Sequence, residues 1–292
     1  EDTIKPFIYD HLIYYNNKLR NYDQALFYAN AFIENSSEIQ DTAKLALGYY
    51  RKAMVQKYLD NQLEVLKNLY KSQNLYLTSK DSMNAGKRLV ELGIAQRRLG
   101  DFIGSKNSQV KALQLFDNFS DSTYFLSIYN NLATSYRQLN DLEEAIDEYK
   151  NALVYSKSKN DSLTVLNNIA NIYADLEEYD EALSIFENIL PQTDNNYVGY
   201  RIKDNYYFTQ WLNDQQLVSI DSLESVLMKR LKNNDQIGLM ASYDHLTQVY
   251  LKTQTDKAFS YAKKYYRQAV QTDNPTDQVR ALKYAIQIGN DK

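Results

Sequence analysis

Residues 131–152 read NLATSYRQLNDLEEAIDEYKNA, and this stretch decides the fold. Its small and apolar side chains recur every three or four positions, which is the spacing of one face of an amphipathic helix. They are Leu132, Ala133 and Tyr136 in the first half and Ala145, Tyr149 and Ala152 in the second. The break between the halves, at Asn140 and Asp141, leaves room only for a tight turn. The stretch is therefore predicted to form a hairpin of two antiparallel helices.

The same hairpin is predicted to recur, because an aspartate followed by a hydroxyl residue returns every 40 positions. The four pairs are Asp41-Thr42, Asp81-Ser82, Asp121-Ser122 and Asp161-Ser162. These residue types favour the N-cap of a helix, since a side-chain oxygen accepts from the free backbone N–H groups of the first turn. A fixed period in this range is typical of a solenoid, in which each unit packs on its neighbours.

The hairpins of residues 121–195 resemble the tetratricopeptide repeat (TPR), whose pattern is W-x2-L-G-x2-Y … A-x3-F … P. The first of them carries the six residues named above. The second carries Ile169, Ala170, Tyr173, Ala182, Phe186 and Pro191. An earlier unit keeps Leu92-Gly93 but has Gln96 in place of the tyrosine. The resemblance covers almost the whole chain and implies an all-α fold, a right-handed α-α superhelix.

The predicted architecture is a single TPR-like solenoid over residues 1–292, with about seven helical hairpins plus a C-terminal capping helix. The hairpins are expected at approximately 5–40, 41–80, 81–120, 121–160, 161–195, 196–233 and 234–273, and the capping helix at 275–289. The early period of 40 residues exceeds the 34 that is usual for the repeat. We expect the extra residues to lengthen the helices rather than to form new loops.

Composition supports long helices and narrows the classes of function. The 292 residues include only 8 Gly and 3 Pro, fewer turn formers than a sheet requires, and no Cys, which excludes disulfides and thiol chemistry. The formal net charge of −4 lacks the basic excess typical of nucleic-acid binders. No apolar run is long enough to span a membrane. The basic clusters at 228–232 and 263–267 are interpreted as solvated helix faces.

Nothing in the sequence indicates catalysis, a metal site or a cofactor, and the chain is not expected to be an enzyme. It has no phosphate-binding glycine loop, no paired metal-ligand motif and no nucleophile elbow. His11 and His245 fall in hairpins at opposite ends of the array and are interpreted as packed or solvated. The acidic runs at 141–148 and 177–181 begin second helices, where negative charge favours the helix dipole.

The resemblance implies a place for a partner, because the first helix of each TPR hairpin lines a concave groove where ligands usually bind. The candidate groove residues are Asn130, Asn131, Thr134, Arg137, Asn167, Asn168, Asn171 and Asn205. An asparagine carboxamide both donates and accepts hydrogen bonds. Such a row can hold the backbone of an extended peptide, as it does in some TPR proteins. The alternative interpretation is that asparagine is merely a tolerated polar residue, since it is common throughout this sequence.

Aromatic residues concentrate in the divergent sixth hairpin, where two interpretations stay open. Tyr207 and Trp211 are candidates for lining an aromatic pocket. The alternative is core packing, since tyrosine and tryptophan are favoured in solenoid cores as well as at interfaces.

The sequence favours a protein- or peptide-binding TPR scaffold that serves as the sensory or interaction region of a bacterial signalling protein, by analogy with long TPR arrays. The expected partner is a protein or peptide and not a nucleic acid, with no membrane insertion within this segment. Glu1 as the first residue fits a removed leader, which favours an extracytoplasmic, periplasmic location over a cytoplasmic one. The alternatives are a free-standing TPR adaptor or assembly factor and a ligand-capture subunit. The oligomeric state is not predicted.

Overall fold

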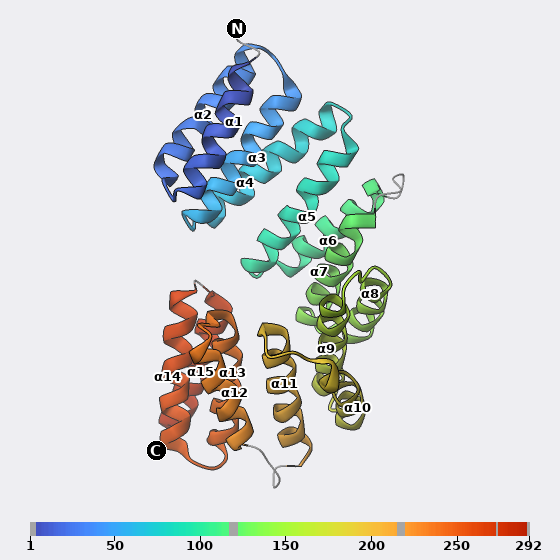
Figure 1. Ribbon diagram of the computed structural model, residues 1–292, viewed down its shortest axis with the longest axis vertical. Helices are drawn as coiled ribbons and strands as arrows, with labels where there is room; N and C mark the ends of the chain where they lie inside the picture. The colour runs from blue at the N-terminus through green and yellow to red at the C-terminus, as the bar shows by residue number, and fades with distance from the viewer. Residues whose placement is uncertain (1–3, 117–121, 215–219, 273, 291–292) are drawn as a thin grey trace. The chain divides into compact units, whose positions relative to one another are not determined.

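The computed structural model describes residues 4–116, 122–214, 220–272 and 274–290, and within these ranges all regular structure is helical. The internal contacts of the chain divide it into two compact units, Glu1–Tyr155 and Ser156–Lys292. Each unit is a series of antiparallel helix pairs (Figure 1).

In the described part of the first unit, the two helices of each pair pack on each other, and the second helix of a pair packs on the next pair. The pairs are α1 (Lys5–Lys18) with α2 (Tyr22–Glu38), α3 (Thr42–Tyr58) with α4 (Gln62–Thr78), α5 (Ser82–Arg98) with α6 (Phe102–Phe116), and α7 (Phe125–Gln138) with α8 (Leu142–Val154). The short 3-10 helix η1 (Ser122–Tyr124) precedes α7. The sequence predicts hairpins in this region at approximately 5–40, 41–80, 81–120 and 121–160.

The second unit continues the same pattern. Its pairs are α9 (Lys159–Asp175) with α10 (Tyr179–Ile189), α11 (Tyr197–Asn213) with α12 (Ile220–Lys232), and α13 (Gln236–Leu251) with α14 (Thr255–Gln271). The 3-10 helix η2 (Leu190–Gln192) follows α10. The last helix, α15 (Pro275–Asn290), packs on α14 and α13, where the sequence predicts a capping helix.

Helices α1 to α5 and α7 end through one repeated backbone motif, which explains the period of the sequence. The residue after the C-cap has a positive φ at positions 20, 40, 60, 80, 100 and 140. The next N–H then bonds the carbonyl five residues back, as Asp81 does to Tyr76 (2.8 Å), which is the Schellman motif. That same next residue is the N-cap of the following helix. The connections that follow these helices therefore take three residues, and α3, α4 and α5 each reach 17 residues. The residues added by the longer period thus lengthen the helices, as expected.

Two of the four predicted caps act as predicted. Asp41 accepts from the backbone N–H of Lys44 (2.9 Å) and Asp81 from that of Asn84 (3.0 Å). Asp121 lies outside the described residues.

The prediction for the fourth pair was wrong, because Asp161 is not the N-cap of α9. Ser158 occupies that position and accepts from the backbone N–H of Asp161 (3.1 Å), while the Asp161 carboxylate accepts from the backbone N–H of Ser158 (3.0 Å). This reciprocal capping box starts the helix at Lys159, earlier than the 40-residue spacing predicts.

Small and aromatic side chains meet in the seams between helices. Ala133, Ala145 and Tyr149 are buried in the first unit, and Ala182 and Phe186 are buried in the second. Alanine lets two helices approach closely, and the aromatic ring beside it fills the remaining space. A single hairpin would leave these side chains in water, so stacking is what stabilises each unit. Among the described residues, no helix combines the length and the apolar character needed to cross a bilayer.

Candidate functional site

The first helices of successive hairpins lie side by side in the second unit, where polar pairs join them. Arg201 on α11 donates to the hydroxyl of Thr164 on α9 (2.8 Å), and Arg280 on α15 pairs with Asp244 on α13 (3.1 Å). We call the surface formed by α9, α11, α13 and α15 the first-helix face of the second unit. It carries four of the predicted asparagines, Asn167, Asn168, Asn171 and Asn205.

Three of these asparagines form a directed hydrogen-bond chain between α9 and α11. Asn205 Nδ2 donates to Asn167 Oδ1 (2.9 Å), and Asn167 Nδ2 donates to Asn168 Oδ1 (3.3 Å). Asn167 is buried and both polar atoms of its carboxamide are used, so it fixes the other two. Asn168 and Asn205, at the ends of the chain, are half-buried.

Asn171 and Asn205 keep unused hydrogen-bonding capacity at the surface. Asn171 is half-buried, one turn after Asn167 on α9, and its side chain makes no hydrogen bond within the described part of the chain. Asn205 donates to Asn167, while its Oδ1 accepts from none of the described residues. Each backbone peptide group of a ligand offers one donor and one acceptor. The two carboxamides can therefore bond the main chain of an extended peptide, with little dependence on its side chains.

The other four predicted groove residues lie on α7, in the first unit. Asn131 is buried and donates to the carbonyl of Ser127 (2.7 Å). Thr134 donates to the carbonyl of Asn130 (2.7 Å) and lies 3.0 Å from the hydroxyl of Tyr149. Asn131 and Thr134 are thus engaged in the packing of α7, whereas Asn130 and Arg137 are half-buried. A peptide-binding role for these residues stays a prediction.

A buried charged cluster lies beside the asparagines and joins α11, α12 and α13. Asp204 is fully buried and accepts from Ser242 Oγ (2.8 Å) and from Arg230 Nη1 (3.3 Å), and its Oδ2 lies 2.9 Å from His245 Nδ1. Arg230, only 1% exposed, also donates to the Gly238 carbonyl and to Ser242 Oγ (2.8 Å). We call Asp204, Arg230, Ser242 and His245 the Asp204 cluster. It fixes the rotation of α11, and with it the position of Asn205.

Burial opposes ionisation of Asp204, but the Arg230 guanidinium, the His245 ring and the hydrogen bonds from His245 and Ser242 outweigh it. Together they hold the pKa of the Asp204 carboxyl below its usual range. A depressed carboxyl pKa stabilises the fold above the unfolded pKa of about 3.9, and this stability is lost as the pH falls through the folded pKa.

We therefore expect the stability advantage of the wild type over Asp204→Asn to be constant from about pH 7 to pH 5 and to shrink below about pH 4. Urea unfolding curves of both proteins across this range measure the difference. An advantage that stays constant down to pH 3, or one that shrinks as the pH rises, would contradict the assignment.

The Asp204 cluster was not predicted from the sequence, and it corrects one interpretation of the sequence. The basic run at 228–232 is not a wholly solvated face, because Arg230 points inward and is buried against Asp204. His245 is packed, as interpreted, and its ring stacks on Phe208 (centroids 4.0 Å apart, planes 6° apart). The four residues come from three helices. The spacing of these residues in the sequence does not predict that they contact one another.

The two candidate pocket aromatics pack against the core of the second unit. Trp211 is buried in a cluster that includes Leu223, Leu246 and Tyr250, and Tyr207 packs against the same cluster. Lys252 lies over the indole ring of Trp211, 5.3 Å from its centroid. Trp211 is thus packed in the core, and a pocket-lining role for the two aromatics stays a prediction.

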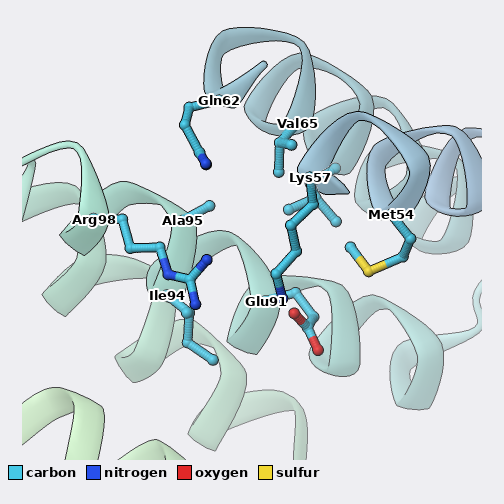
Figure 2. A pocket seen from close by; sticks show the side chains of 9 residues that line it. Met54, Lys57, Gln62, Val65, Glu91, Ile94, Ala95 and Arg98 are labelled. Carbon is cyan, nitrogen blue, oxygen red and sulfur yellow. The ribbon is translucent and has the colours of Figure 1, made fainter. Parts of the chain in front are cut away.

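A small pocket lies in the first unit between α3, α4 and α5 (Figure 2). It is lined by Met54, Lys57, Gln62, Val65, Leu69, Glu91, Ile94, Ala95 and Arg98. Lys57 extends from α3 towards α5, where Glu91 lies. The cavity volume is ≈ 10 Å³, room for about one water molecule. The pocket is therefore too small to take a ligand as it stands. The described residues include no cluster of His, Asp and Glu that could hold a metal ion.

Comparisons with known proteins identify the architecture. Residues 103–237 match the family model of soluble NSF attachment protein, SNAP. The apo form of RapI is similar over 98% of this chain and 77% of its own, with 11% identity and a TM-score of 0.74. The apo form of the quorum sensor NprR from B. thuringiensis is similar over 89% of this chain and 73% of its own, with 15% identity and a TM-score of 0.65.

A third similar structure contains a bound peptide. It is the Rap conjugation gene regulator of the plasmid pLS20 in complex with the Phr* peptide, similar over 96% of this chain and 73% of its own, with 17% identity and a TM-score of 0.58. A search of curated proteins found no match to this chain. At these identities the similar structures establish the fold alone. With the stacked hairpins, they show that the chain is a TPR-like repeat protein, an all-α helical solenoid.

Proposed function

We propose that this TPR-like repeat protein binds an extended peptide on the first-helix face of its second unit. The observation that carries the proposal is the hydrogen-bonding capacity left at Asn171 and Asn205, beside a buried asparagine that holds α9 and α11 in register. The Asn205 carboxamide, held by its hydrogen bond to Asn167, is preorganised, so little of its side-chain entropy is lost when a peptide binds.

Similar structures support a peptide as the ligand. The pLS20 Rap regulator was solved with the Phr* peptide, and another Rap protein was solved with competence and sporulation factor. The first-helix face also carries polar side chains such as Arg201 and Arg280, which join neighbouring helices.

A finer proposal is that peptide binding serves a sensory role in bacterial signalling. Its support is the similarity to a conjugation gene regulator and to a quorum sensor. A sensory role requires the free and peptide-bound states to differ at a second place, for example in amide exchange outside α9 and α11. Identical exchange in both states away from the peptide would leave a simple binding scaffold.

The peptide-binding proposal is tested with a pool of random heptapeptides passed over the immobilised chain. Peptides that are retained are identified by mass spectrometry, resynthesised with a fluorophore and titrated. We expect the double variant Asn171→Ala/Asn205→Ala to weaken binding about 10-fold or more, because each lost hydrogen bond is worth roughly 0.5–1.5 kcal/mol. Fluorescence anisotropy measures the dissociation constant.

The matched control is Asn151→Ala/Asn188→Ala, which removes two exposed asparagines from the second helices α8 and α10. The control should bind like the wild type. Asn171→Ala alone separates binding from packing, since the Asn171 side chain makes no hydrogen bond within the described chain. Equal affinity of the wild type and the Asn171/Asn205 variant would reject the proposed site, and a pool from which nothing is retained would reject peptide binding.

A further inference from the structure

The last helix of the second unit, α15, occupies the position of a first helix. It packs on α14 and α13 in the way that α13 packs on α12 and α11. The Tyr284 hydroxyl of α15 donates to Asp244 of α13 (2.7 Å), just as His245 Nδ1 of α13 lies 2.9 Å from Asp204 of α11. Both aspartates are buried. Tyr284 on α15 therefore corresponds to His245 on α13.

On α13, one stripe of side chains is covered by the second helix α14. The stripe consists of Met240, Tyr243 and Thr247, and each of them is at most 8% exposed. Thr272 on α14 donates to Met240 Sδ (3.2 Å), and the ring of Tyr243 lies against that of Tyr261 on α14 (centroids 6.3 Å apart). A first helix of this unit is thus packed against a second helix along this side.

The corresponding stripe of α15 is apolar but exposed. Counted from Tyr284, it consists of Val279, Leu282 and Ile286, which are 52%, 45% and 63% exposed. On the neighbouring α14, the exposed apolar side chains are those of Phe259, Tyr266 and Val270, which share one face of the helix. We call these six residues the C-terminal apolar surface. Contiguous exposed apolar side chains of this kind mark interaction sites.

Positive charge surrounds the C-terminal apolar surface. α14 and α15 together carry six basic residues and two acidic ones, although the net charge of the whole chain is −4. Lys263, Arg267 and Lys283 are exposed, and their spacing from the apolar residues places them on or beside the two stripes. Asp277, one of the two acids, accepts from the Tyr265 hydroxyl (2.6 Å). The charge favours an acidic partner over a second copy of the same basic surface.

We propose that the C-terminal apolar surface binds an amphipathic helix of a partner protein, and that the polar face of this helix is acidic. The helix packs on α15 as α14 packs on α13, and its apolar stripe covers Val279, Leu282 and Ile286. Its carboxylates complement the surrounding lysines and arginine. The surface uses other residues than the peptide site on α9 and α11, so either proposal can fail without the other.

The probe for this surface is a synthetic peptide based on α14, the helix that covers the equivalent stripe of α13. It has the sequence of Thr255–Gln271 with glutamate at the four basic positions, Lys257, Lys263, Lys264 and Arg267. The peptide carries a fluorophore, and anisotropy measures its dissociation constant. We expect it to bind the wild type and to gain helical circular dichroism when it binds. No binding at peptide concentrations up to about 1 mM would overturn the proposal.

The double variant Leu282→Asp/Ile286→Asp should weaken probe binding about 10-fold or more, because it places charge in the centre of the apolar contact. Leu282→Ala/Ile286→Ala serves if the first variant does not fold, and it should weaken binding about 3-fold or more. The matched control is Met228→Asp/Leu231→Asp on α12, whose side chains are 64% and 45% exposed. The control should bind like the wild type. Equal affinity of the wild type and the Leu282/Ile286 variants would reject the site.

Two further measurements test the nature of the partner. A peptide with the unchanged, basic α14 sequence should bind at least about 5-fold more weakly than the acidic probe at low salt, and the difference should shrink as salt is added. Equal affinities at low salt would overturn the assignment to an acidic helix. Sedimentation velocity should give the same mass for the wild type and for Leu282→Asp/Ile286→Asp. A wild-type dimer that this variant abolishes would assign the surface to a second copy and overturn the proposal.

Discussion

Replacing Asp204 with leucine is expected to lower the free energy of unfolding by about 3–5 kcal/mol. The substitution removes the fully buried carboxylate partner of Arg230. It leaves the longer ion pair of Arg230 Nε with Asp235 (3.6 Å) and the hydrogen bonds to the Gly238 carbonyl and the Ser242 hydroxyl. It also leaves His245 Nδ1 without its carboxylate. Urea unfolding followed by circular dichroism at pH 7 measures the loss.

The double variant Asp204→Leu/Arg230→Met distinguishes a broken ion pair from a damaged core. If the loss comes from an uncompensated charge, removing the charge as well should restore most of the stability, so the two substitutions are strongly non-additive. A loss below about 1 kcal/mol for Asp204→Leu, or additive losses in the double variant, would show that the cluster does not hold α11, α12 and α13 together.

Replacing Phe186 with alanine is expected to lower the free energy of unfolding by about 3–5 kcal/mol through the cavity it leaves. Phe186 is fully buried in a cluster with Leu163, Ala182 and Ile202, and its ring meets Tyr206 nearly edge-on (centroids 6.3 Å apart, planes 66° apart). Because each hairpin packs only on its neighbours, the effect should be local. Hydrogen exchange should speed up in α9–α11 and stay nearly unchanged in α1–α4.

The matched control is Phe259→Ala on α14, whose ring is 46% exposed. It should change stability by no more than about 0.5 kcal/mol. Exchange that speeds up equally in all helices after Phe186→Ala would show that the chain unfolds as one body, against the expectation for stacked repeats.

The fold could be predicted from the sequence because the same apolar spacing and the same helix-capping residues recur in successive repeats. Apolar spacing predicts the helices. The residue whose N–H closes the C-terminal motif of one helix is also the N-cap of the next helix, so the turns recur with a fixed period. Ala145 and Phe186 occupy the buried positions that the TPR resemblance implies. The start of α9 was misplaced because Ser158 competes with Asp161 for the same role, and both residue types are good caps.

The candidate site was only partly readable. The asparagines on α9 and α11 were identified, but nothing in their spacing shows that Asn167 is buried and bonded to Asn205 while Asn171 is not bonded. The role of Arg230 was not predicted, because a single arginine in a helix looks the same whether it faces water or a carboxylate. The partner of Arg230 lies on another helix, since Asp204 is 26 residues away in the sequence.

The central claim, that a peptide lies on the first-helix face of the second unit, is tested most directly by nuclear magnetic resonance of the side-chain carboxamides. A retained heptapeptide is titrated into ¹⁵N-labelled protein, and the signals of Asn171 and Asn205 are assigned from the single alanine variants. Both signals should shift with the dissociation constant that anisotropy gives, while those of Asn151 and Asn188 stay in place. Saturating peptide that leaves the Asn171 and Asn205 signals unmoved would contradict the account.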